Sequence, residues 1–428
     1  MVANSIPAEW QLTTLGSIAK KEYGLVDGPF GSNLPASDYV PVGVPVIRGS
    51  NLSLGDVSFK GDEFVYVSEE TAKRLERSLC RPEDIVFTKK GTLGQTGFVP
   101  TLHRYKKFLI SSNQMKLSVD RRVADPRFVY HYVSSPASRE KIIRDSEATG
   151  VPKTNLAYLR TFPILLPPLD EQKAIAHILG TLDDKIELNQ QMNQTLEAIA
   201  RALFKSWFID FDPVRAKMDG RQPAGMDAET AALFPAEFED SALGKIPKGW
   251  RVGKLEDLIV LQRGFDLPKT DRTPGKYPVL AASGASGTHS EYKVKGPGVT
   301  TGRSGVLGRV FFVHEDFWPL NTSLWIKEFR SSRPIHAYHL LQDLNFEVFN
   351  AGSAVPTLNR NHVHGLPVID APLAVVEKFE EIAPIFRQSK ANEEQSNSIT
   401  SIRDVLLPKL LSGEIRVQDA EKIVEAVV

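Results

Sequence analysis

Apolar and core-type residues recur at alternating three- and four-residue steps through the proline-free stretch 170–212. The unbroken series of 3-4 steps predicts a coiled-coil seam rather than an ordinary surface helix. The predicted seam positions are Ile175, Ile178, Leu182, Lys185, Asn189, Met192, Leu196, Ile199 and Leu203. A shift of 203 residues gives a second, poorer seam at Lys378, Glu381, Ile385, Gln388, Asn392, Gln395, Ile399, Ile402 and Leu406. Two unrelated amphipathic helices are the alternative interpretation.

Two long helices at matching places in a chain most simply pack on each other. We expect an antiparallel pair, with Asn189 and Asn392 near a pseudo-two-fold axis, where a polar seam residue fixes the register. About 37 helical residues span roughly 55 Å. Such a pair is long enough to hold two globular units about one turn of DNA, roughly 34 Å, apart.

The globular segments also repeat. "IPAEWQLTTLGSIAK" at 6–20 returns as "IPKGWRVGKLEDLIV" at 246–260, and "TGVPKTNLAYLRTFPILLPPL" at 149–169 as "GSAVPTLNRNHVHGLPVIDAPL" at 352–373. Both halves carry a glycine turn between β-branched and aromatic runs, "TKKGTLGQTGFV" and "TTGRSGVLGRVFFV", which predicts strand, turn, strand. The sequence therefore predicts an α/β (α+β) protein with an internal repeat.

The repeat and the seams predict five segments. They are a first globular domain at 1–168, a first coiled-coil helix at 169–208, a connector at 209–245, a second globular domain at 246–373, and a second coiled-coil helix with a tail at 374–428. The connector is acidic and rich in Pro, Gly and Ala, so we expect a surface segment with one short helix.

The composition, 42% hydrophobic and 24% charged, is that of a globular protein. The chain has no run of about 18 apolar residues, and its start has neither a basic nor an apolar signal region, so we expect a cytoplasmic protein. The single cysteine, Cys80, excludes an internal disulfide and a multi-thiolate metal site, and we interpret it as a packing residue.

The net charge is zero, but the charges are sorted along the chain. Residues 1–168 hold 22 Lys/Arg against 17 Asp/Glu, and residues 247–372 hold 15 against 11, while the remaining segments are acidic. Two mildly basic blocks on an otherwise acidic frame are typical of a chain with two modules that face a polyanion.

A search for catalytic motifs leaves no active site. "DGPF" at 27–30 is one residue from the Asp-Pro-Pro-Phe of amino methyltransferases, but the chain has no Gly-x-Gly-x-x-Gly cofactor loop. "TTGRSGVLGRV" lacks the lysine of a nucleotide-triphosphate loop. Glu171-Gln172-Lys173 matches the Glu-x-Lys of metal-dependent nucleases, yet it follows "PPLD", where acidic residues favour a helix start. His362 and His364 would share one face of a strand, but no third metal ligand is near in the sequence.

What remains is a set of glycine turns that carry Lys, Arg, Thr, Gln and Asn, side chains that contact phosphates and base edges. A loop beside DNA is therefore the preferred interpretation of "DGPFGSNL" at 27–34.

Several stretches together resemble one known family, the specificity subunits of type I restriction-modification systems. They are "VDGPFGSNL", "VPVIRGSNL", "DIVFTKKGTLGQTGFV", "PPLDEQKAIAHILGTLDDKI", "LFKSWFIDFDPV" and "LLPKLLSGEIRV". The resemblance runs the length of the chain and includes the internal repeat. The second half departs from it locally, with "LQRGFDLP" in place of "DGPFGS" and "APLAVVEKFEE" without the "PLxEQ" helix start.

The resemblance implies a DNA-binding subunit without catalytic residues, cofactor or metal of its own. Each half would hold a target-recognition domain that reads one part of a split DNA sequence, and the antiparallel coiled coil would set the gap. The coil would also recruit two methyltransferase subunits, which methylate adenine with S-adenosylmethionine. Motor-nuclease subunits, which use ATP and Mg²⁺, would join them, and no membrane is implied.

By position in the turns and loops, we predict two sets of DNA-binding residues. In the first domain they are Gly28, Phe30, Gly31, Ser32, Arg48, Asn51, Lys89, Lys90, Thr92, Gln95, Asn113 and Gln114. In the second they are Arg263, Ser283, Ser286, Thr301, Arg303, Ser304, Arg309 and Asn321. Arg48, Lys89, Lys90 and Arg303 lead because Arg and Lys dominate phosphate contacts and guanine readout.

A stand-alone sequence-specific DNA-binding regulator is the alternative function. It explains the repeat and the sorted charge, but not two such long helices with apolar surface left for partners. A third hypothesis, a methyltransferase in its own right, is opposed by the missing cofactor loop.

Overall fold

The computed structural model describes residues 7–425 except 55–56, 62, 147–152, 345 and 347–356. The described chain divides into two compact units. The first unit comprises the residues up to Gln190 together with those from Glu393 onward, and the second comprises Gln191–Asn392. The start and end of the predicted first and last segments, 1–6 and 426–428, lie outside the described residues.

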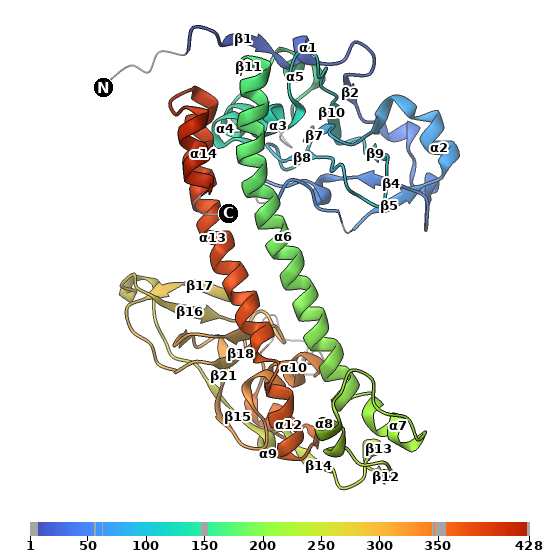
Figure 1. Cartoon of the computed structure of the whole chain (residues 1–428), viewed down its shortest axis with the longest axis vertical. Coiled ribbons are helices and arrows are strands. Elements are labelled where there is room, and N and C mark those ends of the chain that lie inside the picture. Colours follow the sequence, from blue (N-terminus) through green and yellow to red (C-terminus); the bar gives the residue numbers. More distant parts are fainter. Residues whose placement is uncertain are drawn as a thin grey trace. The chain divides into compact units, whose positions relative to one another are not determined.

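The first unit is built on two main sheets (Figure 1). One has the strand order β2-β10-β7-β8, the other β3-β5-β4-β9-β6, and β1 pairs with β11 beside them. The strands are β1 Gln11–Thr14, β2 Leu25–Asp27, β3 Tyr39–Val40, β4 Val44–Ile47, β5 Val65–Val67, β6 Leu79–Cys80, β7 Ile85–Thr88, β8 Thr96–Phe98, β9 Phe108–Ile110, β10 Gln114–Leu117 and β11 Pro163–Leu166. The short helices are α1 Leu15–Ile18, α2 Glu69–Arg74, α3 Pro126–Ser134, α4 Pro136–Arg144 and α5 Leu156–Thr161.

The second unit repeats this plan. Its main sheet has the order β15-β21-β18-β19, and a smaller one has the order β17-β16-β20. The strands are β12 Phe238–Ser241, β13 Gly244–Pro247, β14 Arg251–Lys254, β15 Ile259–Arg263, β16 Tyr277–Ala281, β17 Gly284–His289, β18 Gly298–Gly302, β19 Val310–Val313, β20 Trp318–Pro319, β21 Ser323–Phe329 and β22 Pro367–Asp370. The short helices are α7 Asp212–Met218, α8 Ala228–Ala232, α9 Leu255–Leu258, α10 Pro334–Asp343 and α11 Arg360–His364.

The internal repeat is confirmed in the two-stranded pairs, the main sheets and the parallel strand pairs, while the second sheets have five and three strands. β1 is followed by α1 and pairs antiparallel with β11, and β14 is followed by α9 and pairs antiparallel with β22. In both main sheets the strand that follows the short helix lies at one edge, and the glycine turn joins the last two strands at the opposite edge. Each unit also contains one parallel strand pair, β4 with β9 and β16 with β20.

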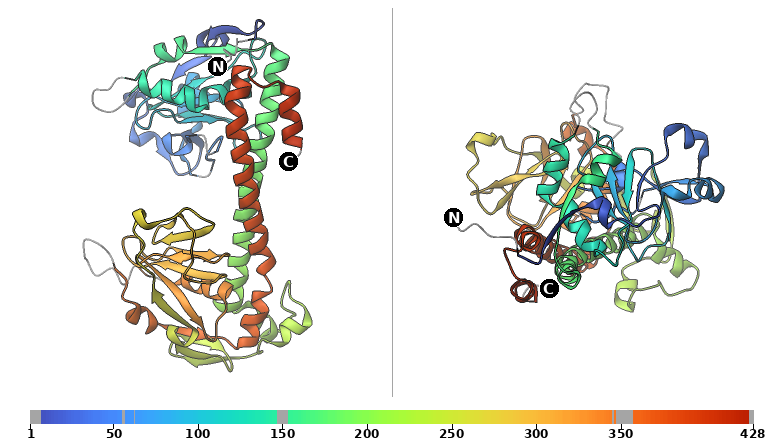
Figure 2. Two further views of the ribbon diagram at one scale, coloured as in Figure 1. Left: turned by 90° about the vertical axis from the view of Figure 1, so that its left-hand side faces the viewer. Right: turned by 90° about the horizontal axis from the view of Figure 1, so that it is seen from above.

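The first long helix, α6, runs from Leu169 to Phe208 (Figure 2). Its start is held by the first unit, because Trp10 Nε1 donates to Glu171 Oε2 at 3.1 Å and Gln172 Nε2 to the carbonyl of Pro167 at 2.8 Å. The helix-start interpretation of Glu171-Gln172-Lys173 is therefore confirmed.

The second predicted helix is interrupted. α12 covers Leu373–Glu380, α13 covers Ala383–Ser412, and α14 covers Val417–Glu425. Within the first unit, α13 and α14 contribute to the same core as the sheet, through Ile399, Leu406, Leu410, Ala420 and Val424. α14 and the part of α13 from Glu393 onward therefore belong to the first unit.

The two halves of the predicted seam differ in burial. Ile175, Ile178, Leu182 and Asn189 are buried, but Met192 and Ile199 are 38% and 44% exposed. Leu196 and Leu203 are only partly buried, and so are Ile385 and Ile402 on the second helix, whereas Asn392, Ile399 and Leu406 are buried.

The inward face of α6 continues instead through Asn193, Ala200 and Phe204. Leu182 and Asn193, Asn189 and Ala200, and Asn193 and Phe204 are each 11 residues apart. An 11-residue spacing corresponds to about 3.67 residues per turn. The inward positions of α6 therefore do not follow the repeat of 3.5 residues per turn on which the predicted seam is based.

Within each unit, hydrogen bonds between polar side chains join α6 to α13. Their order along the two helices shows that the helices are antiparallel. In the first unit Asn189 Nδ2 donates to Gln395 Oε1 at 3.0 Å and to Ser396 Oγ at 3.2 Å. In the second, Asn392 Nδ2 donates to Asn193 Oδ1 at 2.8 Å. The shift of 203 residues turns the pair Asn189–Ser396 into the pair Asn392–Asn193, so the two contacts are equivalent under the repeat.

The connector is more than a surface segment. It forms two short helices, α7 and α8, and the hairpin β12-β13. Phe211, Val214 and Phe234 are buried in the core of the second unit, together with Trp250 and Phe379. The prediction of a single helix was wrong because these apolar residues, spaced among Pro and Gly, pack onto the second domain.

Cys80 is fully buried in the first unit, and burial raises the pKa of its thiol. This confirms the packing interpretation. None of the described helices is long and apolar enough to cross a membrane.

Candidate nucleic-acid interface

The glycine turn of the first unit lies directly after β7 and is fixed through its backbone. The N–H groups of Lys89 and Lys90 both donate to the carbonyl of Asn113, at 2.7 and 3.4 Å, and Thr154 N donates to the carbonyl of Lys89 at 2.9 Å. Gly91 and Gly94 have φ of +110° and +82°, which favours glycine at both positions. Lys90 and Thr92 point into solvent, while Lys89 is half-buried.

The "DGPFGS" loop lies against this turn. Gly28 N donates to the carbonyl of Gln114 at 2.9 Å, and a Cβ at Gly28 would lie 1.9 Å from the carbonyl oxygen of Ser111. Only glycine permits this approach. Phe30 is 69% exposed, and Lys89 Nζ lies 5.7 Å from the centre of its ring and 3.0 Å from Asp27 Oδ1.

The loop after β4 reaches the same place. Gly49 lies beside the side-chain amides of Gln95 and Gln114, since a Cβ built on it would be 3.6 and 3.8 Å from them. Gln95 Oε1 also accepts from Thr88 Oγ1 at 3.3 Å. Three loops far apart in the sequence, after β2, β4 and β7, thus meet at one end of the first unit's sheets.

The second unit builds the same scaffold around different side chains. The N–H groups of Arg303 and Ser304 both donate to the carbonyl of Thr322, at 2.9 and 3.1 Å, and Leu358 N donates to the carbonyl of Arg303 at 2.8 Å. Gly305 and Gly308 have φ of +87° and +72°.

These contacts match those of the first unit one by one, so Arg303 occupies the place of Lys89. The carbonyls of Gln95 and Arg309 likewise accept from equivalent strand ends, Thr88 N at 3.1 Å and Gly302 N at 3.0 Å. The repeat therefore places a basic side chain at the same backbone position in each domain.

The side chains around Arg303 differ from those around Lys89. Asp266 pairs with Arg263, whose Nη2 lies 3.4 Å from its Oδ1, and accepts a hydrogen bond from the amide of Asn321. Arg303 Nη1 donates to the carbonyl of Asn321 at 3.3 Å. Arg309 is exposed, with its guanidinium carbon 5.4 Å from the centre of the Phe311 ring. The predicted residues Arg263, Arg303 and Asn321 therefore form one polar cluster.

Other predicted positions lie at the edge of these clusters. Gly31, Ser32, Arg48 and Asn113 are exposed in the first unit, as is Ser283 in the second. Ser286 is half-buried and accepts from Arg272 Nη1, and Ser304 Oγ lies 3.3 Å from Thr357 Oγ1.

Besides Gly28, three predicted residues are buried inside the fold. Asn51 is 1% exposed, and its amide donates to the carbonyls of Lys60 and Glu63 while its oxygen accepts from Arg48 N. Gln114 is 1% exposed and bonded to Ser111, and Thr301 is 1% exposed within β18. Asn51 and Gln114 hold the loops in place through these contacts. The same residue types occur in turns and in binding sites, so the sequence does not distinguish the two roles.

Sequence reasoning missed Asp27 and Asp266. Each carboxylate lies beside a predicted basic residue, Lys89 and Arg263 respectively. Asp27 directly precedes Gly28, whereas Asp266 follows Gly264 by two residues, so the two acids share no position in the repeat that would have marked them in the sequence.

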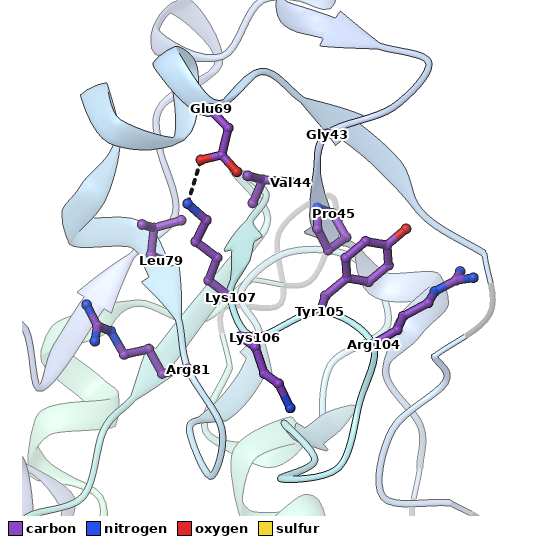
Figure 3. A pocket seen from close by; sticks show the side chains of 10 residues that line it. All are labelled: Gly43, Val44, Pro45, Glu69, Leu79, Arg81, Arg104, Tyr105, Lys106 and Lys107. Atoms are coloured by element: carbon purple, nitrogen blue, oxygen red, sulfur yellow. Dashed lines mark hydrogen bonds and ion pairs between the residues drawn. The ribbon is translucent and has the colours of Figure 1, made fainter.

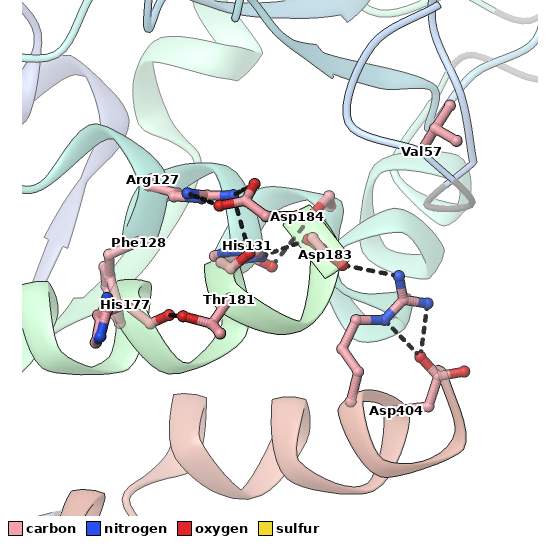
Figure 4. Close-up of polar contacts among 12 residues, drawn as sticks. Val57, Arg127, Phe128, His131, His177, Thr181, Asp183, Asp184 and Asp404 are labelled. Carbon is pink, nitrogen blue, oxygen red and sulfur yellow. Dashed lines mark hydrogen bonds and ion pairs between the residues drawn. The ribbon is translucent and has the colours of Figure 1, made fainter. Parts of the chain in front are cut away.

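The first unit fastens α6 to its globular part through a second polar cluster (Figure 4). Arg127 of α3 pairs with Asp184 through both guanidinium nitrogens and donates to the carbonyl of Gly180 at 3.1 Å. Asp183 accepts from Arg403 Nη1 of α13 at 3.0 Å and lies 3.7 Å from Nδ1 of His131. Burial lowers the pKa of His131 to about 4, so its ring is neutral near pH 7.

Neither histidine of the sequence pair 362/364 lies on a strand. Both are in α11, and His364 Nε2 accepts from Leu261 N at 2.8 Å. Among the described residues, no three His, Cys, Asp or Glu side chains are grouped as metal ligands would be.

The chain matches the family model described as "Type I restriction modification DNA specificity domain" twice, over residues 7–198 and 247–375. The two matches cover most of the chain, each over one copy of the repeat. The chain therefore belongs to the type I restriction-modification specificity subunits.

Similar proteins span three quarters or more of the chain. A type I restriction enzyme HindI specificity subunit from Haemophilus influenzae is 26% identical over 76% of this chain and 87% of its own length. A MjaIX specificity subunit from Methanocaldococcus jannaschii is 24% identical over 97% and 95%. The crystal structure of a type I S subunit from M. genitalium has the same fold, with a TM-score of 0.60 at 16% identity over 96% of this chain and 97% of that one.

Proposed function

We propose that this specificity subunit reads a split DNA sequence with its two domains and itself supplies no reacting group. One part of the target would be read at the loops around Lys89 and the other at the loops around Arg303. The observation that carries the proposal is the matched backbone scaffold, which presents a basic side chain beside a glycine turn in both units. Arg and Lys in such turns contact phosphates and guanine edges.

We further propose that the paired helices α6 and α13 recruit two methyltransferase subunits, which bring S-adenosylmethionine. Motor-nuclease subunits with ATP and Mg²⁺ would join the same complex. Exposed apolar side chains on the helices support a protein partner there, since Leu188 is 49% and Val405 58% exposed.

The test is to map N6-methyladenine across the genome in cells with and without the gene. We expect one split motif, with two specific parts around a fixed gap and a methylated adenine on each strand, to disappear with the gene. An unchanged methylome with the partner genes expressed would contradict the proposal and favour a stand-alone regulator.

Replacing Arg303 with alanine is expected to weaken DNA binding and leave methyltransferase assembly intact. A lost charged contact to phosphate or guanine corresponds to about 1–3 kcal/mol, or roughly 5- to 150-fold in affinity. Fluorescence anisotropy with the mapped target measures the affinity, and gel filtration with the methyltransferase subunits measures assembly.

Lys89→Ala is the matching variant in the first unit, and Lys245→Ala, an exposed lysine of β13, is the control. We expect each loop variant to weaken discrimination in one half of the split motif only. If Arg303→Ala binds DNA as tightly as Lys245→Ala, Arg303 is not part of the interface.

A further inference from the structure

A basic cleft lies at the opposite end of the first unit's parallel strands from the predicted DNA-binding loops. β4 and β9 run parallel, and Arg48 and Ser111 follow their carboxyl ends. Gly43 and Lys107 precede their amino ends and line a cavity of about 380 Å³. Since β4 has four residues at about 3.3 Å each, the two ends are roughly 10 Å apart and face opposite ways.

The cleft carries a surplus of positive charge (Figure 3). Arg81, Arg104, Lys106 and Lys107 line it, and Glu69 is the acidic residue among its lining side chains. Lys107 Nζ is 2.5 Å from Glu69 Oε2, so this pair is neutral. Figure 3 shows the charged ends of the other three turned away from that pair. In the part of the chain that the structure describes, Arg81 and Lys106 have no ion-pair partner.

The charge is not part of the repeated plan. Leu109 of β9 and Trp318 of β20 hold the same place in the two parallel strand pairs, opposite Val46 and Val279. Counting back from them aligns Lys106-Lys107 with Glu315-Asp316. The second unit thus carries two acids where the first carries two bases, so the cleft does not serve a task that both domains share.

We propose that this cleft binds a phosphate group, separately from the recognition loops. Its volume lies in the range of small-ligand sites, about 300–1,000 Å³. Val44, Pro45 and Leu79 give it an apolar wall, while Arg81 and Lys106 offer free donors to an anion. Two sources share this chemistry, a free nucleotide and the backbone of DNA outside the recognised sequence.

The experiment uses the full chain and titrates ATP, AMP and inorganic phosphate by calorimetry at low salt. Arg81→Ala/Lys106→Ala removes the two free cations, and Lys106→Glu introduces the residue of the second unit. The control is Lys20→Ala/Lys21→Ala, which removes two charges of the same domain outside the cleft. If a free nucleotide is the source, we expect the cleft variants to lose at least roughly tenfold in its affinity and the control to lose little.

The DNA arm rests on the proposed function and compares a duplex bearing only the mapped target with one that has long flanks. If DNA is the source, the cleft variants bind the short duplex normally and lose the added affinity of the flanks. Failure of the proposed function would remove target binding in every variant and leave the nucleotide arm intact. Cleft variants that match the control with every probe would overturn the phosphate site.

Discussion

Arg403→Ala is expected to lower the free energy of unfolding of the first unit by about 3–5 kcal/mol, the usual loss when one partner of a buried ion pair is removed. Arg403 has a side-chain exposure of 14% and Asp183 of 18%. Arg403 also donates to Asp404 through Nε at 3.1 Å and Nη2 at 2.9 Å. Its guanidinium therefore connects α13 to α6 while compensating two carboxylates.

Without Arg403, Asp183 would lie beside His131, whose ring is uncharged near pH 7 because burial lowers its pKa to about 4. Among the described residues no other cation forms an ion pair with Asp183, so water would be the main compensation of its carboxylate. The loss should appear in urea denaturation followed by circular dichroism, as an earlier transition for the first unit.

Two variants on the same helix serve as controls. Lys409 Nζ lies 3.9 Å from Glu414 in a surface pair whose side chains are about half exposed, so Lys409→Ala should change the free energy of unfolding by 1 kcal/mol or less. Arg403→Lys keeps the positive charge but loses the planar guanidinium that contacts both Asp183 and Asp404. Its free energy of unfolding should lie between those of Arg403→Ala and Lys409→Ala. Equal stabilities for Arg403→Ala and Lys409→Ala would show that the buried cluster does not hold the helices.

The repeat made most of the fold predictable. Trp10 and Trp250 recur in equal sequence contexts, and each lies in a core just before the strand that opens its copy of the repeat, β1 or β14. The two glycine turns were predictable because a backbone with φ above zero favours glycine. Each turn has two such positions three residues apart, Gly91 and Gly94 in the first unit and Gly305 and Gly308 in the second.

The register of the helices was less predictable. After Asn189, a step of three residues places Met192 inward and a step of four places Asn193 inward. The seam prediction names Met192, the apolar residue of the two. The structure turns Asn193 inward because polar groups already line this level of the pair, where Asn392 and the carbonyl of Ser389 bond to it. The periodicity of one helix does not reveal which residues of the other helix will face it, so it could not predict this contact.

The candidate site was predictable at the level of loops but not of side chains. Asn51 and exposed Arg48 are three residues apart in one turn, yet Asn51 is bonded on three sides inside the domain. Asn is favoured in turns and at base edges for the same donors and acceptors. Only tertiary contacts separate these two uses.

Acid is expected to destabilise the second unit by about 3–4 kcal/mol between pH 7 and pH 5. His336 and His339 of α10 are each 2% exposed. Burial lowers the pKa of His336 to about 3 and that of His339 to about 4, from 6.5. Both rings stay neutral in the folded protein, while the unfolded chain takes up their protons below pH 6.5. Stability is therefore lost as the pH falls through that value, by about 1.4 kcal/mol per pH unit for each histidine.

Glu380 acts in the opposite direction. It accepts from the N–H groups of Ile335 and His336, and burial raises the pKa of its carboxyl, so the folded state gains its proton first. The histidines should dominate because two of them begin to titrate in the unfolded chain at a higher pH than an unfolded glutamate does. The net slope of stability against pH therefore stays positive.

His339→Phe isolates one histidine, because the ring already lies among Phe204, Phe379 and Phe386, with centroids 5.5 to 6.1 Å away. We expect the pH slope of the second unit's unfolding free energy to fall by about half, measured by urea denaturation with tryptophan fluorescence between pH 7 and pH 5. His362→Gln, an exposed histidine of α11, is the matched control and should leave the slope unchanged. If His339→Phe keeps the wild-type slope, His339 is already protonated in the folded protein. The surrounding aromatic rings could stabilise that cation only through contacts with their faces.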